Sequence, residues 1–232
     1  TNELVKSFFH HKDSITGLVF RRGHEELFSS SMDRSVKLWN IAEMTYVESL
    51  FGHQEGILDL DCSVKERCIS VGGRDRSLHL FKILDESQLV FRIDDGKYGS
   101  LNCCKMIDDE HFVCSTECSS LLLFSISKKK PIFEVKNAHE DGSMICSIGK
   151  IVFSNVIITG STSGNIRIWE VGERRDSLKL NQQFNINGFP NCISTSYDGS
   201  LIAIAAGREP RLGRWDKRTD FVNGTFLIRL SE

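Results

Sequence analysis

The stretch Ser29–Asn40, SSSMDRSVKLWN, is one copy of a unit that returns about every 40 to 46 residues along the chain. It places an acidic residue, Asp33, six residues before an aromatic one, Trp39. Comparable aromatic endings follow at intervals of 42, 43, 45 and 46 residues, at Phe81, Phe124, Trp169 and Trp215. Such regular spacing indicates a repeat architecture with five units rather than a single α/β domain.

Each unit has the pattern of a β-hairpin. The segments SVKLW, SLHLF, SLLLF and NIRIW alternate polar and apolar residues with the period of two that a half-buried strand requires. The segments ELFSS, CISVG, HFVCS and VIITG supply the preceding arm, and turn residues such as Gly72, Gly73 and Gly164 separate the arms. Sheets stacked radially around an axis cover one another and leave only short edges. The sequence therefore predicts an all-β propeller.

Four-stranded units with a Trp-Asp-like ending resemble WD repeats. In WD repeats a His before the first strand, a Ser or Thr, the turn Asp and the Trp form a buried chain of hydrogen bonds that fixes the turn between the two middle strands. The resemblance assigns these roles to His11, Ser29 or Ser31, Asp33 and Trp39 in the first repeat, and to His53 and Asp75 in the second. Because Phe81 has no indole N–H to donate, we expect the second network to be the weaker one.

The third and fourth repeats lack the turn Asp. Cys118 stands at this position in the third repeat and Ser163 in the fourth, although the fourth keeps His139 and Trp169. We expect these two blades to depend on apolar packing instead. Polar residues at repeat-locked spacing usually satisfy buried groups, so a structural role is favoured over a catalytic one for His11, His53, Asp33 and Asp75.

The composition excludes several classes of protein. With 232 residues, of which 40% are hydrophobic and 26% charged, the chain can form a sizeable core. No apolar run approaches the roughly 18 residues of a membrane helix, and the N-terminus has no signal-peptide pattern, so we expect neither membrane association nor secretion. The formal net charge of −2 argues against an indiscriminate polyanion binder.

Eight cysteines are scattered through mostly strand-like segments. We interpret them as reduced core thiols of an intracellular protein, and we expect no metal and no other cofactor. Cys114 and Cys118 are close in sequence, but no second pair completes a tetrahedral zinc site.

No low-complexity linker divides the chain, so residues 1–232 are expected to form one propeller domain with blades at about 9–51, 52–94, 95–137, 138–184 and 185–232. We expect Thr1 to Phe9 to be a lone outer strand, and Thr225 to Leu230 to be the outer strand of the repeat that ends at Trp215. Two such strands are one too many for a closed five-bladed ring. The favoured interpretation is a fragment of a larger, seven-bladed ring, with a closed five-bladed ring as the alternative.

Four longer segments, FRRGHEELFSSSMDRSVKLWN, YVESLFGHQEG, VGGRDRSLHLFKILDESQLVF and GREPRLGRWDK, together resemble the WD-repeat proteins of the U3 small nucleolar ribonucleoprotein. The phrases DESQLVF and RLGRW lie outside the general repeat pattern and make the resemblance specific. It covers essentially the whole chain. PRLGRWD departs from the family, which tends to have His before the Arg and a second Trp after the first.

The resemblance implies a non-enzymatic scaffold that binds U3 small nucleolar RNA at its box B/C element, beside a kink-turn-binding core protein. It also implies contacts with other small-subunit processome proteins, a role in pre-ribosomal RNA processing and small ribosomal subunit biogenesis, and a location in the nucleolus. It implies no membrane partner and no small-molecule substrate. Two blades and a basic N-terminal extension of the family are expected to be missing from this sequence.

Residues that flank the turn Asp of a WD blade lie on the narrow rim of the propeller. Arginine there suits bidentate phosphate contacts and stacking on unpaired bases. We hypothesise that six arginines beside the turns form an RNA-facing patch: Arg34, Arg74, Arg76, Arg208, Arg211 and Arg214. The equally weighted alternative is that Arg34 and Arg76 form local ion pairs and that Arg214 belongs to the interior of a strand.

Two other classes of function remain as alternatives. A general WD-repeat platform for protein–protein interaction would use the same fold without direct RNA binding. An enzyme is the least favoured class, because the sequence has no G-x-S-x-G, H-E-x-x-H or P-loop motif and the repeated His and Asp residues already have structural roles.

Overall fold

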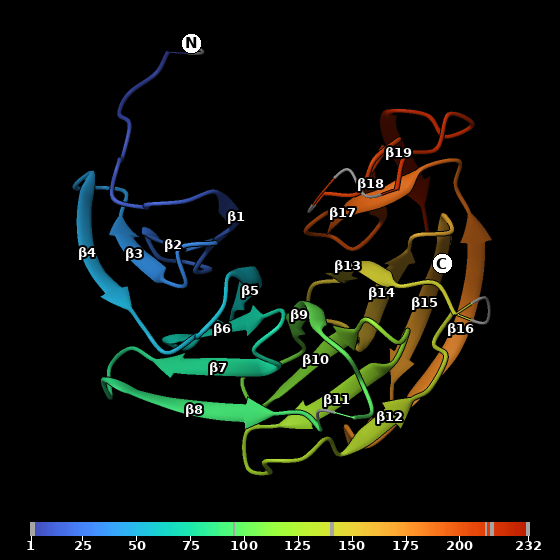
Figure 1. Cartoon of the computed structure of the whole chain (residues 1–232), viewed down its shortest axis with the longest axis horizontal. Coiled ribbons are helices and arrows are strands. Elements are labelled where there is room, and N and C mark those ends of the chain that lie inside the picture. The colour runs from blue at the N-terminus through green and yellow to red at the C-terminus, as the bar shows by residue number, and fades with distance from the viewer. Residues whose placement is uncertain (1–2, 95, 140–141, 212, 214–215, 231–232) are drawn as a thin grey trace.

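The computed structural model describes residues 3–94, 96–139, 142–211, 213 and 216–230. Within these ranges the regular structure is entirely β, in five antiparallel sheets, which confirms the all-β prediction (Figure 1). The described residues contain no helix long and apolar enough to cross a membrane.

The first three sheets have four strands each, joined in simple up-and-down order. The first sheet contains β1 (Ile15–Phe20), β2 (Glu26–Ser31), β3 (Val36–Asn40) and β4 (Thr45–Leu50). The second contains β5 (Ile57–Cys62), β6 (Arg67–Gly72), β7 (Ser77–Lys82) and β8 (Ser87–Arg92). The third contains β9 (Leu101–Met106), β10 (His111–Thr116), β11 (Leu121–Ser125) and β12 (Phe133–Val135).

The last two sheets continue this order. The fourth contains β13 (Ile145–Lys150), β14 (Val156–Ser161), β15 (Asn165–Val171) and β16 (Leu178–Asn185). The fifth has three strands within the described part of the chain, β17 (Phe189–Thr195), β18 (Leu201–Gly207) and β19 (Gly224–Arg229). Each sheet therefore corresponds to one of the repeats expected from the sequence.

The sheets lie around a central axis, with the first strand of each sheet innermost (Figure 1). The inner strands β1, β5, β9, β13 and β17 contact one another in chain order. Four clusters of buried apolar side chains fill the spaces between successive sheets. In the space between the second and third sheets, for example, the rings of Phe112 and Phe124 stack with their centroids 5.2 Å apart. Burial between neighbours is what makes the radial arrangement stable.

The N-terminal segment differs from its expected conformation. Residues 3–14 form no strand, so the predicted lone outer strand is wrong as far as the described residues go. Instead the segment packs by its side chains on the first sheet: the Phe8 ring lies 4.7 Å from that of Trp39, and the His10 ring stacks on Tyr46 at 4.8 Å. Aromatic contacts and hydrogen bonds, rather than pairing as a strand, hold it there.

The fifth sheet also differs from the prediction. Residues Thr225 to Leu230 were expected to form an outer strand, but β19 pairs directly with β18 and is therefore the third strand. The RLGRW phrase was expected to end that third strand. Its described residues, Arg211 and Gly213, are not in a strand, and Trp215 lies outside the described residues. The physical reason is that the Arg211 side chain is held by carbonyl groups on the inner strands of the first two sheets.

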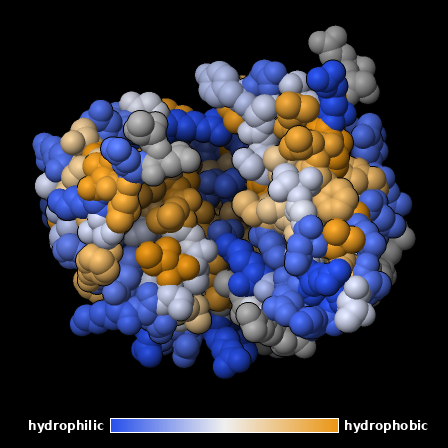
Figure 2. All heavy atoms as spheres, turned by 90° about the horizontal axis from the view of Figure 1, so that it is seen from above, coloured by the Kyte–Doolittle hydropathy of each residue, from blue (hydrophilic) through white to orange (hydrophobic). Residues whose placement is uncertain are grey.

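Seen from above the view of Figure 1, apolar side chains gather on both sides of a hollow (Figure 2). The strands β1 and β19 each carry exposed apolar side chains, among them Leu18, Phe20 and Leu227. Within the described part of the chain, neither strand has a further sheet packed against this face.

Candidate functional site

The turns between the second and third strands lie at one end of every sheet, and we call this side of the propeller the turn face. In the first four sheets these turns correspond to residues 32–35, 73–76, 117–120 and 162–164. All the polar residues assigned to turn locks, and most of the arginines assigned to RNA contact, belong to this face. Its geometry therefore decides how those side chains are presented.

The first turn is fixed by a complete chain of hydrogen bonds. The Nδ1 atom of His11 lies 2.8 Å from Asp33 Oδ2, and its Nε2 atom lies 2.7 Å from Ser29 Oγ. Trp39 Nε1 donates to the same hydroxyl at 2.8 Å. Asp33 Oδ1 also accepts from the backbone and hydroxyl of Ser35. The side chains of His11 and Asp33 are almost fully buried, so these bonds satisfy groups that water does not reach.

The second turn has a larger network than the sequence suggests. His53 bridges Asp75 and Ser70 at 2.8 and 2.7 Å, as His11 does in the first sheet. His79 then extends it, because its Nε2 lies 3.1 Å from Ser77 Oγ and its Nδ1 lies 2.9 Å from Gln88 Oε1. The chain from Asp75 through His53 ends at Ser70, as expected for a repeat with Phe81 in place of Trp, while His79 and Gln88 add hydrogen bonds on its other side, at Ser77.

The fourth turn keeps three of the four lock residues, contrary to the expectation that it depends on apolar packing alone. His139 Nε2 lies 3.0 Å from Thr159 Oγ1, and Trp169 Nε1 donates to the same hydroxyl at 2.9 Å. Thr159 precedes Trp169 by ten residues, as Ser29 precedes Trp39. That spacing was a signal in the sequence from which the role of Thr159 could have been inferred.

The two carboxylates of the turn locks make the fold sensitive to acid. Burial alone would raise the pKa of Asp33, but hydrogen bonds from Ser35, the Lys12 backbone and His11 outweigh it, and the pKa lies well below 3.8. Burial is likewise outweighed at Asp75, whose pKa is lowered chiefly by His53. Because the folded pKa is below the unfolded one of about 4, the stabilisation is complete above about pH 5 and is lost progressively as the pH falls from there toward the folded values.

We therefore expect the thermal unfolding midpoint to fall as the pH is lowered from about 5 to about 3. A variant with Asp33→Asn and Asp75→Asn should be less stable at neutral pH and should show a shallower dependence on pH. The measurement is thermal unfolding followed by circular dichroism in a pH series. Equal slopes for the two proteins would mean that other carboxyl groups determine the acid sensitivity.

Two arginines of the turn face occupy a backbone conformation that favours glycine. Arg34 and Arg76 directly follow the turn Asp and have φ values of 71° and 54°. The corresponding residue of the fourth turn is Gly164, with φ 86°. Left-handed backbone is unfavourable by roughly 1 kcal/mol or more for a residue with a β-carbon. Ser119 of the third turn has φ 57°, so the left-handed residue is a feature of all four turns, and in the first two it carries an arginine.

The remaining predicted arginines differ in their surroundings, and of these Arg74 lies in the same turn as Arg76. Arg74 is exposed, and its charge helps to lower the pKa of Glu117 on the next turn, after the larger effect of hydrogen bonds from Ser100. Arg208 is exposed and donates from Nε to the Phe221 carbonyl at 2.7 Å. Arg214 lies outside the described residues.

Arg211 turns inward to the central channel. Its guanidinium donates to the carbonyl groups of Thr16 on β1 at 3.1 Å and of Leu58 on β5 at 3.2 Å, and it lies 3.9 Å from Asp59. Its backbone N–H also donates to Asn191 on β17. This arginine therefore connects the fifth sheet to the first two sheets and does not project with Arg34 and Arg74.

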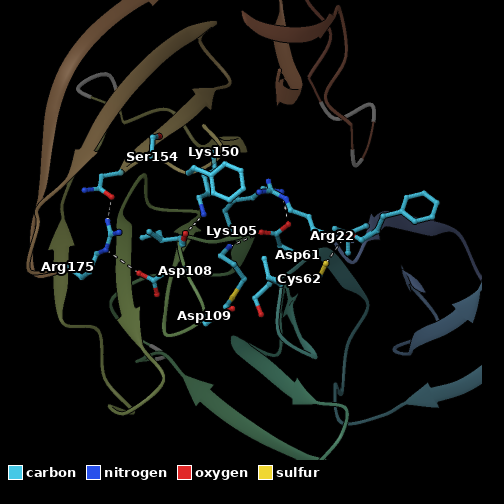
Figure 3. Close-up of a pocket in the computed structure, with 17 residues that line it drawn as sticks. Arg22, Asp61, Cys62, Lys105, Asp108, Asp109, Lys150, Ser154 and Arg175 are labelled. Carbon is cyan, nitrogen blue, oxygen red and sulfur yellow. Dashed lines mark hydrogen bonds and ion pairs between the residues drawn. The ribbon is translucent and has the colours of Figure 1, made fainter. Parts of the chain in front are cut away.

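The channel holds a second charged group on the neighbouring inner strands. Lys105 on β9 lies 2.9 Å from Asp61 on β5, whose other carboxylate oxygen accepts from the Met106 backbone at 2.8 Å (Figure 3). Burial would lower the pKa of Lys105, but the charges of Asp61 and Asp59 outweigh it and raise that pKa. These charges are satisfied within the protein, so they bind the inner strands together.

The cysteines show no sign of a metal site or a disulfide. All eight are free, and the described residues contain no group of three His, Cys, Asp or Glu side chains that could hold a metal ion. Cys68, Cys103, Cys104 and Cys114 are buried, and burial raises the pKa of each thiol. Cys118 and Cys192 are exposed, so the interpretation of all eight as core residues is wrong for these two.

The radial sheets and the His–Ser–Trp–Asp locks define a WD-repeat β-propeller, a class of generally non-enzymatic scaffolds. The family model for the WD domain, G-beta repeat, matches residues 2–40, 44–82 and 129–170, just over half of the chain. The chain is 38% identical over 232 residues to U3 small nucleolar RNA-interacting protein 2 of Homo sapiens, an alignment that covers 97% of this chain and 48% of that protein. It is 33% identical over 247 residues to U3 snoRNP-associated protein-like EMB2271 of Arabidopsis thaliana, covering 100% and 51%.

The solved structure of U3-55K superimposes with a TM-score of 0.90 at 39% identity and covers 96% of this chain and 70% of that one. The chain spans about half the length of the curated relatives it matches. The chain belongs to the WD-repeat family, within the group of U3 snoRNP-associated WD-repeat proteins.

Proposed function

We propose that this protein is a non-enzymatic RNA- and protein-binding scaffold of the U3 small nucleolar ribonucleoprotein, acting in pre-ribosomal RNA processing and small-subunit biogenesis in the nucleolus. The observation that carries the proposal is the similarity to proteins named for the U3 particle, which extends over nearly the whole chain. The turn locks support the non-enzymatic part, because the repeated His and Asp side chains are already engaged in buried hydrogen bonds.

The turn face is the proposed RNA contact. Arg34 and Arg74 are exposed on adjacent sheets, and no described carboxylate lies within ion-pair distance of either one. Arg76 is half-buried beside them. Rigid turns that present guanidinium groups suit bidentate contact with phosphates and stacking on unpaired bases. The RNA is proposed to be the box B/C element of U3, bound beside a kink-turn-binding core protein, with other processome proteins as further partners.

Charge reversal at the turn face should weaken RNA binding. With Arg34→Glu and Arg74→Glu together, we expect at least a tenfold loss of affinity of the full-length protein for a box B/C hairpin assembled with the kink-turn protein. Each lost phosphate contact should also make the slope of log affinity against log salt shallower by about 0.7 to 0.9. The measurement is a binding titration across a salt series.

The matched control carries Lys129→Glu and Arg174→Glu, two exposed cations in turns between third and fourth strands, at the opposite end of the sheets. This control should bind the RNA nearly as tightly as the wild type. If the two double variants behaved alike, the turn face would not be the contact. If RNA binding were absent for the wild type at every salt concentration, a scaffold for protein partners alone would be the better description.

We also propose that the ring continues beyond the five sheets, as one domain of seven blades. The support comes from the exposed apolar side chains of β1 and β19, which face away from their own neighbours as side chains between blades do. A structure of the full-length protein would test this directly. Further blades should pack against the exposed faces of β1 and β19, whereas in a closed five-bladed ring the first and fifth sheets would pack against each other.

A further inference from the structure

A cavity of about 500 Å³ opens on the side opposite the turn face (Figure 3). We call this side the cavity face; it carries the turns between the first and second strands of each sheet. The cavity is lined by residues from the ends of β1, β5, β9 and β13, from the turns that follow them, and by Arg175 from the turn after β15. Its volume is that of a typical pocket for a small ligand or for a few side chains of a peptide.

The three carboxylates in the wall of the cavity are each paired with a cation. Asp61 lies 2.9 Å from Lys105, and Asp108 lies 3.1 Å from Arg175. Asp109 lies 3.6 Å from Lys65. Within each pair the two charges neutralise each other, so this part of the wall has little net charge.

Two further cations in the same wall have no such partner. No described carboxylate lies within 4.0 Å of the charged group of Arg22 or Lys150. Lys150 Nζ donates only to the carbonyl oxygen of Ile107. Burial lowers the pKa of Lys150, and the positive charge of Arg22 lowers it further. Two like charges thus stand close together in a recess, an arrangement that a bound anion would relieve.

The rim of the cavity carries an exposed aromatic residue in an unfavourable backbone conformation. Phe153 has φ 55° and is 77% exposed. It is the third residue of the turn after β13, and the same position after β1 is Gly23, with φ 76° and the same backbone hydrogen bond across the turn. A bulky residue in left-handed backbone is rare and tends to mark a functional site. The ring gains no burial that would explain its presence.

Phe153 also contacts the neighbouring residues of the rim. Its ring lies edge-on to Tyr197 at 5.7 Å, and the Arg22 guanidinium lies 6.0 Å from its centroid. Tyr197 is 76% exposed as well. An apolar aromatic rim therefore borders two unpaired cations. We propose that the cavity face binds an extended peptide segment of a partner protein, in which an aspartate or glutamate side chain meets Arg22 and Lys150 and a neighbouring apolar side chain packs on Phe153 and Tyr197.

The wall favours a peptide over RNA. Aromatic rings beside cations can also receive a single-stranded nucleic acid. Here, however, the unpaired positive charge in the wall is that of Arg22 and Lys150, which is too little to follow a chain with one phosphate at every nucleotide. Two unpaired cations match one or two carboxylates. The proposed peptide site also lies on the side opposite the proposed RNA contact, so the two interactions are compatible and can be tested separately.

The test starts with a random 12-residue peptide library displayed on phage and selected on the immobilised full-length protein. We expect the selected peptides to be enriched in Asp or Glu next to an aromatic or large aliphatic residue. A parallel selection on the variant with Arg22→Ser and Lys150→Gln should lose this enrichment. Enrichment of basic peptides, or the same enrichment on both proteins, would overturn the proposal.

A labelled peptide from the wild-type selection then serves as probe in fluorescence anisotropy. Phe153→Gly removes the aromatic ring from the rim, so we expect at least a tenfold loss of affinity for the peptide. Because glycine also stands at the same position after β1, the urea unfolding midpoint should not be lower than that of the wild type. The controls are Leu84→Ser and Lys129→Gln, exposed residues in outer turns, which should change neither quantity.

If Phe153→Gly destabilised the protein, the ring would have a packing role and the proposal would fail. Competition of the peptide by a 12-nucleotide oligouridine, abolished by Lys150→Gln, would assign the cavity to RNA instead. Neither result bears on the box B/C titration, because Arg34 and Arg74 remain unchanged in these variants.

Discussion

Replacing Asp75 with alanine should lower the free energy of unfolding by about 3 kcal/mol. Its carboxylate accepts hydrogen bonds from His53 Nδ1 at 2.8 Å, from the backbone of Gln54 at 3.1 Å and from both the backbone and the hydroxyl of Ser77, at 3.0 and 2.9 Å. Its side chain is 6% exposed, so water cannot replace these acceptors. Alanine would remove the acceptor of His53 Nδ1 and of the backbone N–H groups of Gln54 and Ser77. Urea unfolding followed by tryptophan fluorescence measures the loss.

The matched control is Asp85→Ala in the same sheet. Asp85 is 67% exposed and pairs with Lys82 at 3.8 Å across a turn, an interaction worth at most about 0.5 kcal/mol. A loss at Asp75 as small as the loss at Asp85 would show that the lock is not what holds the second turn. The loss of stability in Asp75→Asn should lie between those of Asp75→Ala and Asp85→Ala, because the amide oxygen still accepts hydrogen bonds but carries no charge.

The close packing around Asp75 explains why this turn tolerates little change. Gly72 precedes the turn, and a β-carbon there would overlap both the Asp75 carboxylate and the His53 ring. The neighbouring His79 ring lies 4.1 Å from that of His53 and is itself bonded to Ser77. Removal of one member therefore affects several others, and the effects of two substitutions in this network should not add.

Local repetition is the part of this protein that its sequence predicts well. The period of the aromatic endings and the alternation within SVKLW or NIRIW are set by short-range geometry, because a strand buries every second residue whatever lies far away. The turn residues Asp33 and Asp75 could be found for the same reason, since each stands at a fixed distance from its own strand.

Long-range contacts are the part that the sequence does not predict. The RLGRW phrase looks like a strand ending, but Arg211 is held by carbonyl groups on β1 and β5, more than 150 residues earlier in the chain. Nothing near Arg211 in the sequence marks those acceptors. The same holds for the cavity face, where Arg22 and Phe153 come from turns in different sheets and meet only once the ring has formed.

The charged cluster of the channel is a long-range feature of this kind, and its disruption should have a large effect. Lys105 stands between Asp61, at 2.9 Å, and Asp59, whose buried carboxyl group has a pKa raised above its ordinary value mainly by burial. The charge of Lys105 acts to lower that pKa, and it is one of the two cations, with Arg211, that do so. Without it, the two carboxylates on the same face of β5, Asp59 and Asp61, would share a recess with too little positive charge.

Lys105→Met should therefore lower the free energy of unfolding by about 3 kcal/mol at neutral pH, since it removes one partner of a buried ion pair and leaves the other. The loss should shrink as the pH falls toward about 4, because without Lys105 the pKa of Asp59, already raised by burial, rises further, and protonation of Asp59 removes part of the excess negative charge. Adding Asp61→Leu to Lys105→Met should recover much of the stability, as an apolar pair of similar volume carries no desolvation penalty. The measurement is urea unfolding of the two single variants and the double variant at pH values of about 7 and about 4. If the loss of stability in the double variant instead equalled the sum of the losses in the two single variants, Lys105 and Asp61 would not be energetically coupled. The ion pair would then contribute nothing to holding the inner strands together.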